Sequence, residues 1–228
     1  MTLDFAIRLT EILLGLALLQ QSLEHCRAPL REQLLFMPRA LLCILLILGV
    51  QAWWVSLALV ALGLLILRCF NGPYNGGSDR MSLLILCCLC LILFMPALKG
   101  QEVIFGYLAL QLVLSYFISG LVKIMNPEWR NGRALQDVFS FSAYPASEAL
   151  RAWAQRPRLL CVMSWGVMLF ELLFPLTLLT QATLIAGLVI AAIFHFANAC
   201  LFGLNRFFWI WLAAYPSILW LQHRIFAG

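Results

Sequence analysis

The stretch YFISGLVKIMNPEWRNGRALQ, residues 116–136, is decisive for the fold because it places Lys123 at the end of a long apolar run and then breaks the run. An ammonium group in hydrocarbon costs free energy, so it needs polar neighbours or water. Upstream of the lysine, polar side chains recur every four residues, which puts them on one face of a helix. This polar face carries Tyr107, Gln111, Ser115, Ser119 and Lys123. We expect it to face protein or water and not lipid.

The composition of the whole chain predicts an integral membrane protein. Of its 228 residues, 64% are hydrophobic and 11% are charged, and the mean hydropathy is +0.95. A soluble globular protein is excluded by these values. The net charge of +5 does not indicate nucleic acid, because the basic residues are scattered at the ends of apolar runs and form no patch. The expected partner is the lipid bilayer.

Eight apolar runs predict an all-α integral membrane protein, a polytopic bundle of about eight transmembrane helices, with residues 1–228 forming one membrane domain. The runs cover residues 4–24, 34–50, 52–70, 81–98, 102–124, 159–179, 181–203 and 206–222. Alternate connections then hold twelve and three basic residues, a bias that agrees with the positive-inside rule. The break between the second and third runs is weak, so a count of seven stays open.

The long connection, residues 125–158, is predicted to be a loop with one short interfacial helix. Ser147 and Glu148 form a helix start, and Leu150 and Trp153 alternate with basic and polar residues in an amphipathic pattern. The glycine-rich stretch 70–80 predicts a reverse turn, which we favour over a site for an anion or a polar headgroup.

The eight cysteines lie mostly within apolar runs, where cysteine behaves as a small hydrophobic residue. We therefore expect no disulfide framework. Cys87, Cys88 and Cys90 form a cluster without a histidine nearby in the sequence, so we expect no metal site there.

Other ionisable side chains also lie well inside apolar runs, and such residues are functional candidates because lipid exposure is costly. Glu171 could accept a proton or pair with Lys123. His195 has Asn198 three residues later on the same helix face, which suggests a shared partner. Glu11 is instead expected to belong to an ionic cluster with its neighbours Asp4 and Arg8.

Three segments together resemble a known family. The stretch around Lys123 resembles the segment of vitamin K-dependent γ-glutamyl carboxylases in which a lysine is followed by an acidic or polar pair, Trp, two residues and Gly. FHFANACLFGLNRFFWIWLAAYP, residues 194–216, resembles their Phe-His-x-x-Asn-x-x-Leu-Phe segment, and SWGVMLFELLFPLTLL, residues 164–179, resembles their helix with one acidic residue after Phe. The chain is thus similar to the HTTM (horizontally transferred transmembrane) domain, in its short bacterial stand-alone form.

The resemblance implies roles for named residues. Lys123 would be the base that deprotonates a hydroquinone cofactor, with Glu171 and His195 as further catalytic residues. Positions that would hold the substrate are Asn198, Trp129, Tyr74, Asn75 and Gln111. The family's Trp-Asn-Asn-His segment reads Tyr-Asn-Gly-Gly at 74–77, so its second functional histidine is missing here.

Two functions follow as hypotheses. The first is a quinol- or oxygen-linked modifier in a bacterial inner membrane that acts in the maturation of a peptide or protein. The second is a non-catalytic membrane partner for the export, maturation or immunity of a secreted peptide, with a precursor peptide or a neighbouring subunit as its partner. A transporter has thinner support, since the sequence shows no inverted repeat.

Overall fold

The computed structural model describes residues 1–50, 53–69, 77–142 and 147–226, and all regular elements in these ranges are helices. The chain divides into two compact units. The first unit comprises Met1–Leu110 and Arg206–Gly228, and the second comprises Gln111–Asn205. The all-helical fold class predicted from the sequence is therefore confirmed for the described residues.

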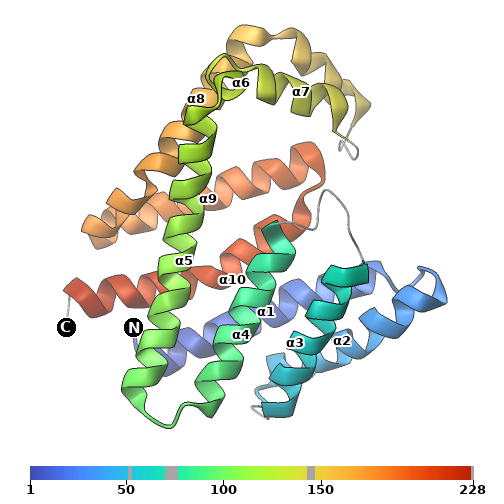
Figure 1. Cartoon of the computed structure of the whole chain (residues 1–228), viewed down its shortest axis with the longest axis vertical. Helices are drawn as coiled ribbons and strands as arrows, with labels where there is room; N and C mark the ends of the chain where they lie inside the picture. Colours follow the sequence, from blue (N-terminus) through green and yellow to red (C-terminus); the bar gives the residue numbers. More distant parts are fainter. Residues whose placement is uncertain (51–52, 70–76, 143–146, 227–228) are drawn as a thin grey trace. The chain divides into compact units, whose positions relative to one another are not determined.

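Figure 1 shows the elements of both units. The first unit holds α1 (Leu3–Glu24), α2 (Leu30–Leu48), α3 (Trp53–Cys69), α4 (Gly77–Phe94), the first part of α5 (Leu98–Met125), and α10 (Asn205–Phe226). The second unit holds the rest of α5, α6 (Pro127–Arg130), α7 (Arg133–Phe141), the 3-10 helix η1 (Glu148–Gln155), α8 (Pro157–Leu173), the 3-10 helix η2 (Phe174–Leu179), and α9 (Gln181–Phe202).

Within the described ranges, four helices are long and apolar enough to cross a membrane. They are Gly77–Phe94, Leu98–Met125, Pro157–Leu179 and Gln181–Phe202. The described part of α3 has 17 residues, which rise about 26 Å and fall short of a hydrocarbon core of about 30 Å. The structure thus supports a membrane protein, and it does not confirm the expected count of eight spans.

Helix α9 shows how such a helix suits a bilayer. Its exposed face carries Ile185, Val189, Ile193 and Phe196. Its buried face carries Leu184, Leu188, Ala191 and His195. Because both faces are rich in apolar residues and His195 lies on the buried face, α9 can contact lipid without exposing a charge.

The first unit is built on an antiparallel pair, α1 and α2, in which the start of α1 lies against the end of α2. Arg8 donates from Nη1 to Glu11 Oε2 and to the Leu46 carbonyl, both at 2.8 Å, and from Nη2 to the Ile47 carbonyl. These carbonyls lie in the last turn of α2, where the Gly49 amide also donates to the Leu46 carbonyl, so the guanidinium completes the cap of the helix. The Arg8–Glu11 pair realises part of the ionic cluster expected from the sequence.

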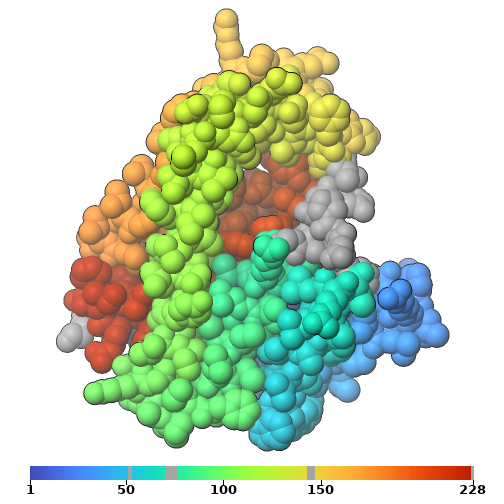
Figure 2. Space-filling view, viewed as in Figure 1, coloured from blue at the N-terminus to red at the C-terminus, as the bar shows by residue number. Residues whose placement is uncertain are grey.

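Helices α3 and α4 also pack together in this unit, with Gly63 of α3 against the Leu83 side chain of α4. Figure 2 shows their side chains next to each other on the face viewed, in cyan and green. Leu64 and Leu65 of α3 are exposed. Exposed leucines on an apolar helix are consistent with contact to lipid tails.

The second unit contains two helices that the sequence analysis did not predict, α6 and α7, in the connection 125–158. Phe139 of α7 packs on Trp153 of η1, with ring centroids 5.7 Å apart, and on Phe202 of α9 at 4.9 Å. Arg151 of η1 donates to the Ser140 carbonyl at 2.5 Å and so ties η1 to α7. The expected amphipathic segment is therefore present as η1, and its place in the membrane interface stays a prediction.

Gly132 joins α6 to α7 and offers a test of this packing. Its φ of 80° lies in the left-handed region, and a Cβ there would lie 2.7 Å from Cys161 Cα of α8. We expect Gly132→Ala to lower the free energy of unfolding by about 1–3 kcal/mol, because both the backbone and the neighbour would be strained. The unfolding temperature of the purified protein in detergent measures this loss.

Gly166→Ala is the matched control. Gly166 lies within α8, and no atom of a neighbour lies within 4 Å of a Cβ placed there. Alanine is favoured over glycine in a helix by about 1 kcal/mol, so this variant should be as stable as the wild type or more so. Equal unfolding temperatures for the two variants would contradict the assigned role of Gly132.

Candidate functional site

Lys123 lies in the last turn of α5, and three oxygen atoms lie within hydrogen-bonding distance of its ammonium group. Its Nζ lies 2.6 Å from each carboxylate oxygen of Glu171 and 2.6 Å from Ser119 Oγ. An ammonium group has three N–H donors, and these three oxygens match that number. The Glu171 side chain is only 4% exposed and that of Lys123 is 18% exposed, so this is a largely desolvated, charge-assisted pair.

Gly120 is the reason α5 and α8 come close enough for this pair. A Cβ at Gly120 would lie 2.7 Å from the backbone nitrogen of Leu172 and 2.9 Å from the Cβ of Glu171. No other residue type fits at that distance. The sequence analysis missed Gly120, because a glycine inside an apolar run gives no sign of what it will contact.

A second polar pair joins α5 to α9. The hydroxyl group of Tyr116 lies 2.8 Å from His195 Nε2, and both residues are at least 95% buried. Tyr116, Ser119 and Lys123 are spaced i, i+3 and i+7, so they lie on the same face of α5. One helix face therefore carries both pairs, and α8 and α9 supply one partner each.

Aromatic rings surround the Tyr116–His195 pair. Phe174 is fully buried, and its ring centroid lies 4.2 Å from that of Tyr116. Phe170 lies 6.1 Å from Tyr116, and Phe194 lies 5.1 Å from His195. These apolar rings keep water from the pair, and a low local dielectric strengthens its hydrogen bond.

The turn after α5 places Trp129 beside the lysine. Asn126 directly follows α5, and its side chain accepts a hydrogen bond from the Glu128 amide at 3.0 Å, which caps α6. The Trp129 ring centroid then lies 5.2 Å from Lys123 Nζ, within the range of a cation–π interaction. Ser164 of α8 donates to the Trp129 carbonyl at 2.5 Å and fixes this position.

The structure thus brings together Lys123, Glu171 and Trp129, and places His195 with Tyr116 on the same face of α5. Asn198 and Gln111 are both half-buried. Tyr74 and Asn75 lie outside the described residues. Tyr116 was not predicted, because the expected polar ladder followed steps of four residues and passed over it.

Metal ligation finds no support in the described ranges. No group of three or more His, Cys, Asp and Glu side chains there could hold a metal ion. Cys87, Cys88 and Cys90 are free thiols of α4, and two of the three are buried.

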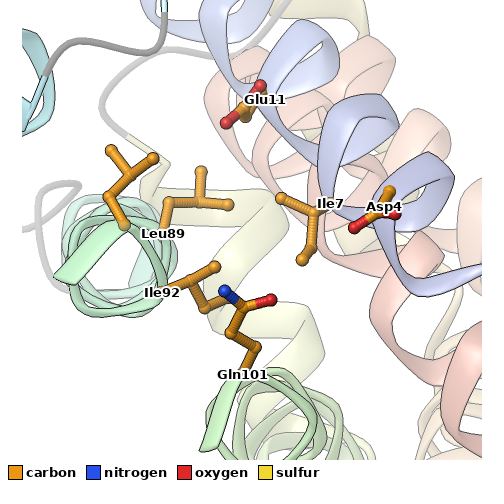
Figure 3. Close-up of a pocket in the computed structure, with 7 residues that line it drawn as sticks. Asp4, Ile7, Glu11, Leu89, Ile92 and Gln101 are labelled. Atoms are coloured by element: carbon orange, nitrogen blue, oxygen red, sulfur yellow. The ribbon is translucent and has the colours of Figure 1, made fainter. Parts of the chain in front are cut away.

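A cavity of about 320 Å³ lies within the first unit (Figure 3). Two carboxylates, one side-chain amide and several apolar side chains line it, namely Asp4, Ile7, Glu11, Leu89, Ile92, Leu93 and Gln101. Figure 3 shows Glu11 and Asp4 on the α1 side and Leu89 and Ile92 across from them on α4. None of the predicted site residues lines this cavity, and Glu11 is already paired with Arg8.

Comparison with the sequence profiles of known protein families assigns the chain to a family. The sequence profile of the HTTM domain matches residues 103–222, which is more than half of the chain. The chain belongs to the HTTM family. The resemblance inferred from three short segments is therefore confirmed, and Lys123, Glu171 and His195 all lie within the matched range. The HTTM domain is associated with vitamin K-dependent carboxylase-like membrane proteins. No curated protein and no solved structure matches the chain.

The strength of the Lys123–Glu171 pair in this HTTM protein can be measured with a double-mutant cycle. Lys123→Met and Glu171→Gln each leave one charge without its partner. Breaking a buried pair costs about 3–5 kcal/mol, and the partial exposure of Lys123 places the expected loss at or below the lower end. The double variant should lose clearly less than the sum of the two. Denaturation midpoints in detergent give all four values.

The exposed pair of Arg133 and Glu128 provides the control cycle. Its atoms are 3.5 Å apart, and the side chains are 67% and 47% exposed. Arg133→Met and Glu128→Gln should therefore show a coupling of less than about 1 kcal/mol. Equal coupling in the two cycles would mean that Lys123 and Glu171 behave as an ordinary surface pair.

Proposed function

We propose that this HTTM protein is a membrane-embedded enzyme that begins its reaction by taking a proton from its substrate, with Lys123 as the base. It would act as a quinol- or oxygen-linked modifier in the maturation of a peptide or protein, as a multi-pass protein of a bacterial inner membrane. The observation that supports this most directly is the contact of Lys123 Nζ with both oxygens of Glu171 at 2.6 Å.

The pair can supply a neutral amine without adding charge to the membrane. If a proton moves from Nζ to a carboxylate oxygen of Glu171, the ion pair becomes a neutral pair of the same total charge. The Nζ lone pair can then accept a proton from an acidic O–H group of the substrate. The resulting ammonium lies beside the new oxyanion and stabilises it. Ser119 can continue to accept one N–H bond throughout.

The surroundings suit an aromatic substrate or cofactor. Tyr116, Phe170, Phe174 and Phe194 supply flat apolar surfaces in the same unit, and the Tyr116–His195 pair adds a polar group among them. A hydroquinone would supply an acidic hydroxyl group and two electrons. In this arrangement Trp129 would shield Lys123 from water, and His195 would orient Tyr116 through their hydrogen bond.

A second candidate function is a non-catalytic partner for a secreted peptide. It is favoured by the completeness of the contacts around Lys123, since an ammonium with three oxygen partners is also what a structural ion pair requires. In this role the second unit would bind a precursor peptide or a neighbouring subunit and assist its export, maturation or immunity.

Replacement of Lys123 by arginine distinguishes the two functions. We expect the wild type in lipid nanodiscs to catalyse oxygen uptake with vitamin K hydroquinone as the probe. Lys123→Ala and Lys123→Arg should both lower the rate by at least about 100-fold, because a guanidinium stays protonated and cannot act as a base. An oxygen electrode measures the rate.

Lys99→Arg serves as the matched control, since Lys99 is exposed in the first turn of the same helix. It should keep the wild-type rate. If Lys123→Arg also kept that rate, Lys123 would not be the base. If no protein-dependent uptake occurred in any variant, the partner function would gain support.

A bound quinone would support the enzyme directly. We expect organic extraction of the purified protein to yield about one quinone per chain, identified by mass spectrometry. An unrelated membrane protein purified from the same membranes gives the background. A value no higher than this background would favour the non-catalytic partner.

A further inference from the structure

A second polar cluster lies in the first unit, apart from the residues of the proposed reaction. It is found where α1 ends and α4 and α10 begin, and α2 passes beside it. Arg39 of α2 is its centre and is 3% exposed. The Arg39 Nε donates to Ser22 Oγ of α1 at 2.9 Å, and its guanidinium lies 4.7 Å from the Phe36 ring centroid.

Four buried polar atoms in this cluster have no hydrogen-bond partner. They are Gln21 Nε2, Arg39 Nη2, Ser78 Oγ and Asp79 Oδ2. All four residues are more than nine-tenths buried, with exposed fractions between 1% and 7%. A buried polar group without a partner costs several kcal/mol, so native proteins satisfy such groups with protein, water or a ligand. Four of them in one cluster point to a bound polar group.

Electrostatic interactions bring these residues together. The Asp79 carboxylate interacts with the guanidinium groups of Arg39 and Arg206 and lies beside the Gln21 amide. Arg39 interacts in turn with Arg206 and Asp79. Arg206 is 31% exposed and contacts His25 Nε2 at 3.1 Å, so it connects the buried cluster to the surface.

The free atoms define the chemistry of the ligand. Arg39 Nη2 and Gln21 Nε2 are donors beside a second arginine, and the starts of α4 and α10 add positive dipole ends, so these groups suit an anion. Asp79 Oδ2 is an acceptor with negative charge, so it suits a cationic N–H donor. A ligand with both groups is a zwitterion.

We propose that Gln21, Arg39, Ser78, Asp79 and Arg206 bind a phosphoethanolamine group. Its phosphate accepts from Arg39 and Gln21 near Arg206, and its ammonium donates to Asp79. The cluster lies at helix ends of a membrane protein, which is the depth at which phospholipid headgroups are found. A choline headgroup has no N–H donor for Asp79, and a glycerol headgroup has no positive charge.

Lipid retention tests the proposal. The purified protein is equilibrated with equal amounts of phosphatidylethanolamine, phosphatidylcholine and phosphatidylglycerol, and the retained lipid is counted by native mass spectrometry. We expect the wild type to retain phosphatidylethanolamine at least tenfold over the other two. Arg39→Gln should abolish this retention. Arg31→Gln, an exposed arginine in the first turn of the same helix, should leave it unchanged.

Asp79→Asn gives an independent readout if Arg39→Gln does not fold. It keeps the phosphate donors and removes the charge that recognises the ammonium, so retention should persist while the preference for ethanolamine over glycerol disappears. An unchanged preference in Asp79→Asn would overturn the proposal.

The source of the group is settled by adding free phosphoethanolamine to lipid-depleted protein. A rise in the unfolding temperature that is lost in Arg39→Gln, together with no lipid retention, would assign a water-soluble ligand of the same chemistry. Equal retention of the three lipids by the wild type and no response to free phosphoethanolamine would refute the site.

Discussion

The second unit depends on one ion pair, that of Lys123 with Glu171. A lysine at the end of an apolar helix is tolerated when its charge is matched, and here a carboxylate of α8 lies 2.6 Å away. That distance requires α5 and α8 to approach closely, which Gly120 permits. The turn at Asn126 and the position of Trp129 follow directly after the lysine. The carboxylate of Glu171, the small size of Gly120 and the turn at Asn126 thus all serve one requirement, which is to bury the charge of Lys123 beside an opposite charge.

The buried cations of the two units differ in how completely they are hydrogen-bonded. In the second unit the ammonium of Lys123 has a full set of oxygen partners, including a carboxylate that can take its proton. In the first unit the guanidinium of Arg39 contacts a hydroxyl group and an aromatic ring and interacts electrostatically with Asp79, and its Nη2 has no hydrogen-bond partner. A complete pair suits proton transfer, whereas unused donors suit a bound anion.

The sequence singled out the charged residues of the candidate site but not the residues that position them. Lys123 and Glu171 were recognisable because ionisable groups are rare in apolar runs, and their local motifs also identified the family. Gly120 was not recognisable, because its role depends on its contact with α8. That contact includes Glu171, which lies 51 residues later in the chain. Helix α7 was missed for a similar reason. It is nine residues long and is stabilised by Phe139 packing on Phe202, far away in the chain.

Packing alone does not account for the Lys123–Glu171 pair. Replacing a buried ion pair by apolar side chains of similar volume often leaves the stability of a folded protein unchanged or raises it. Two charges are therefore not needed merely to hold the helices together. Such a pair can also fix the register of two helices. Here the fit of Gly120 against Leu172 already fixes α8 against α5. Other contacts thus provide both cohesion and register, and the proposed exchange of a proton between Lys123 and Glu171 would give the pair a role that these contacts do not fill.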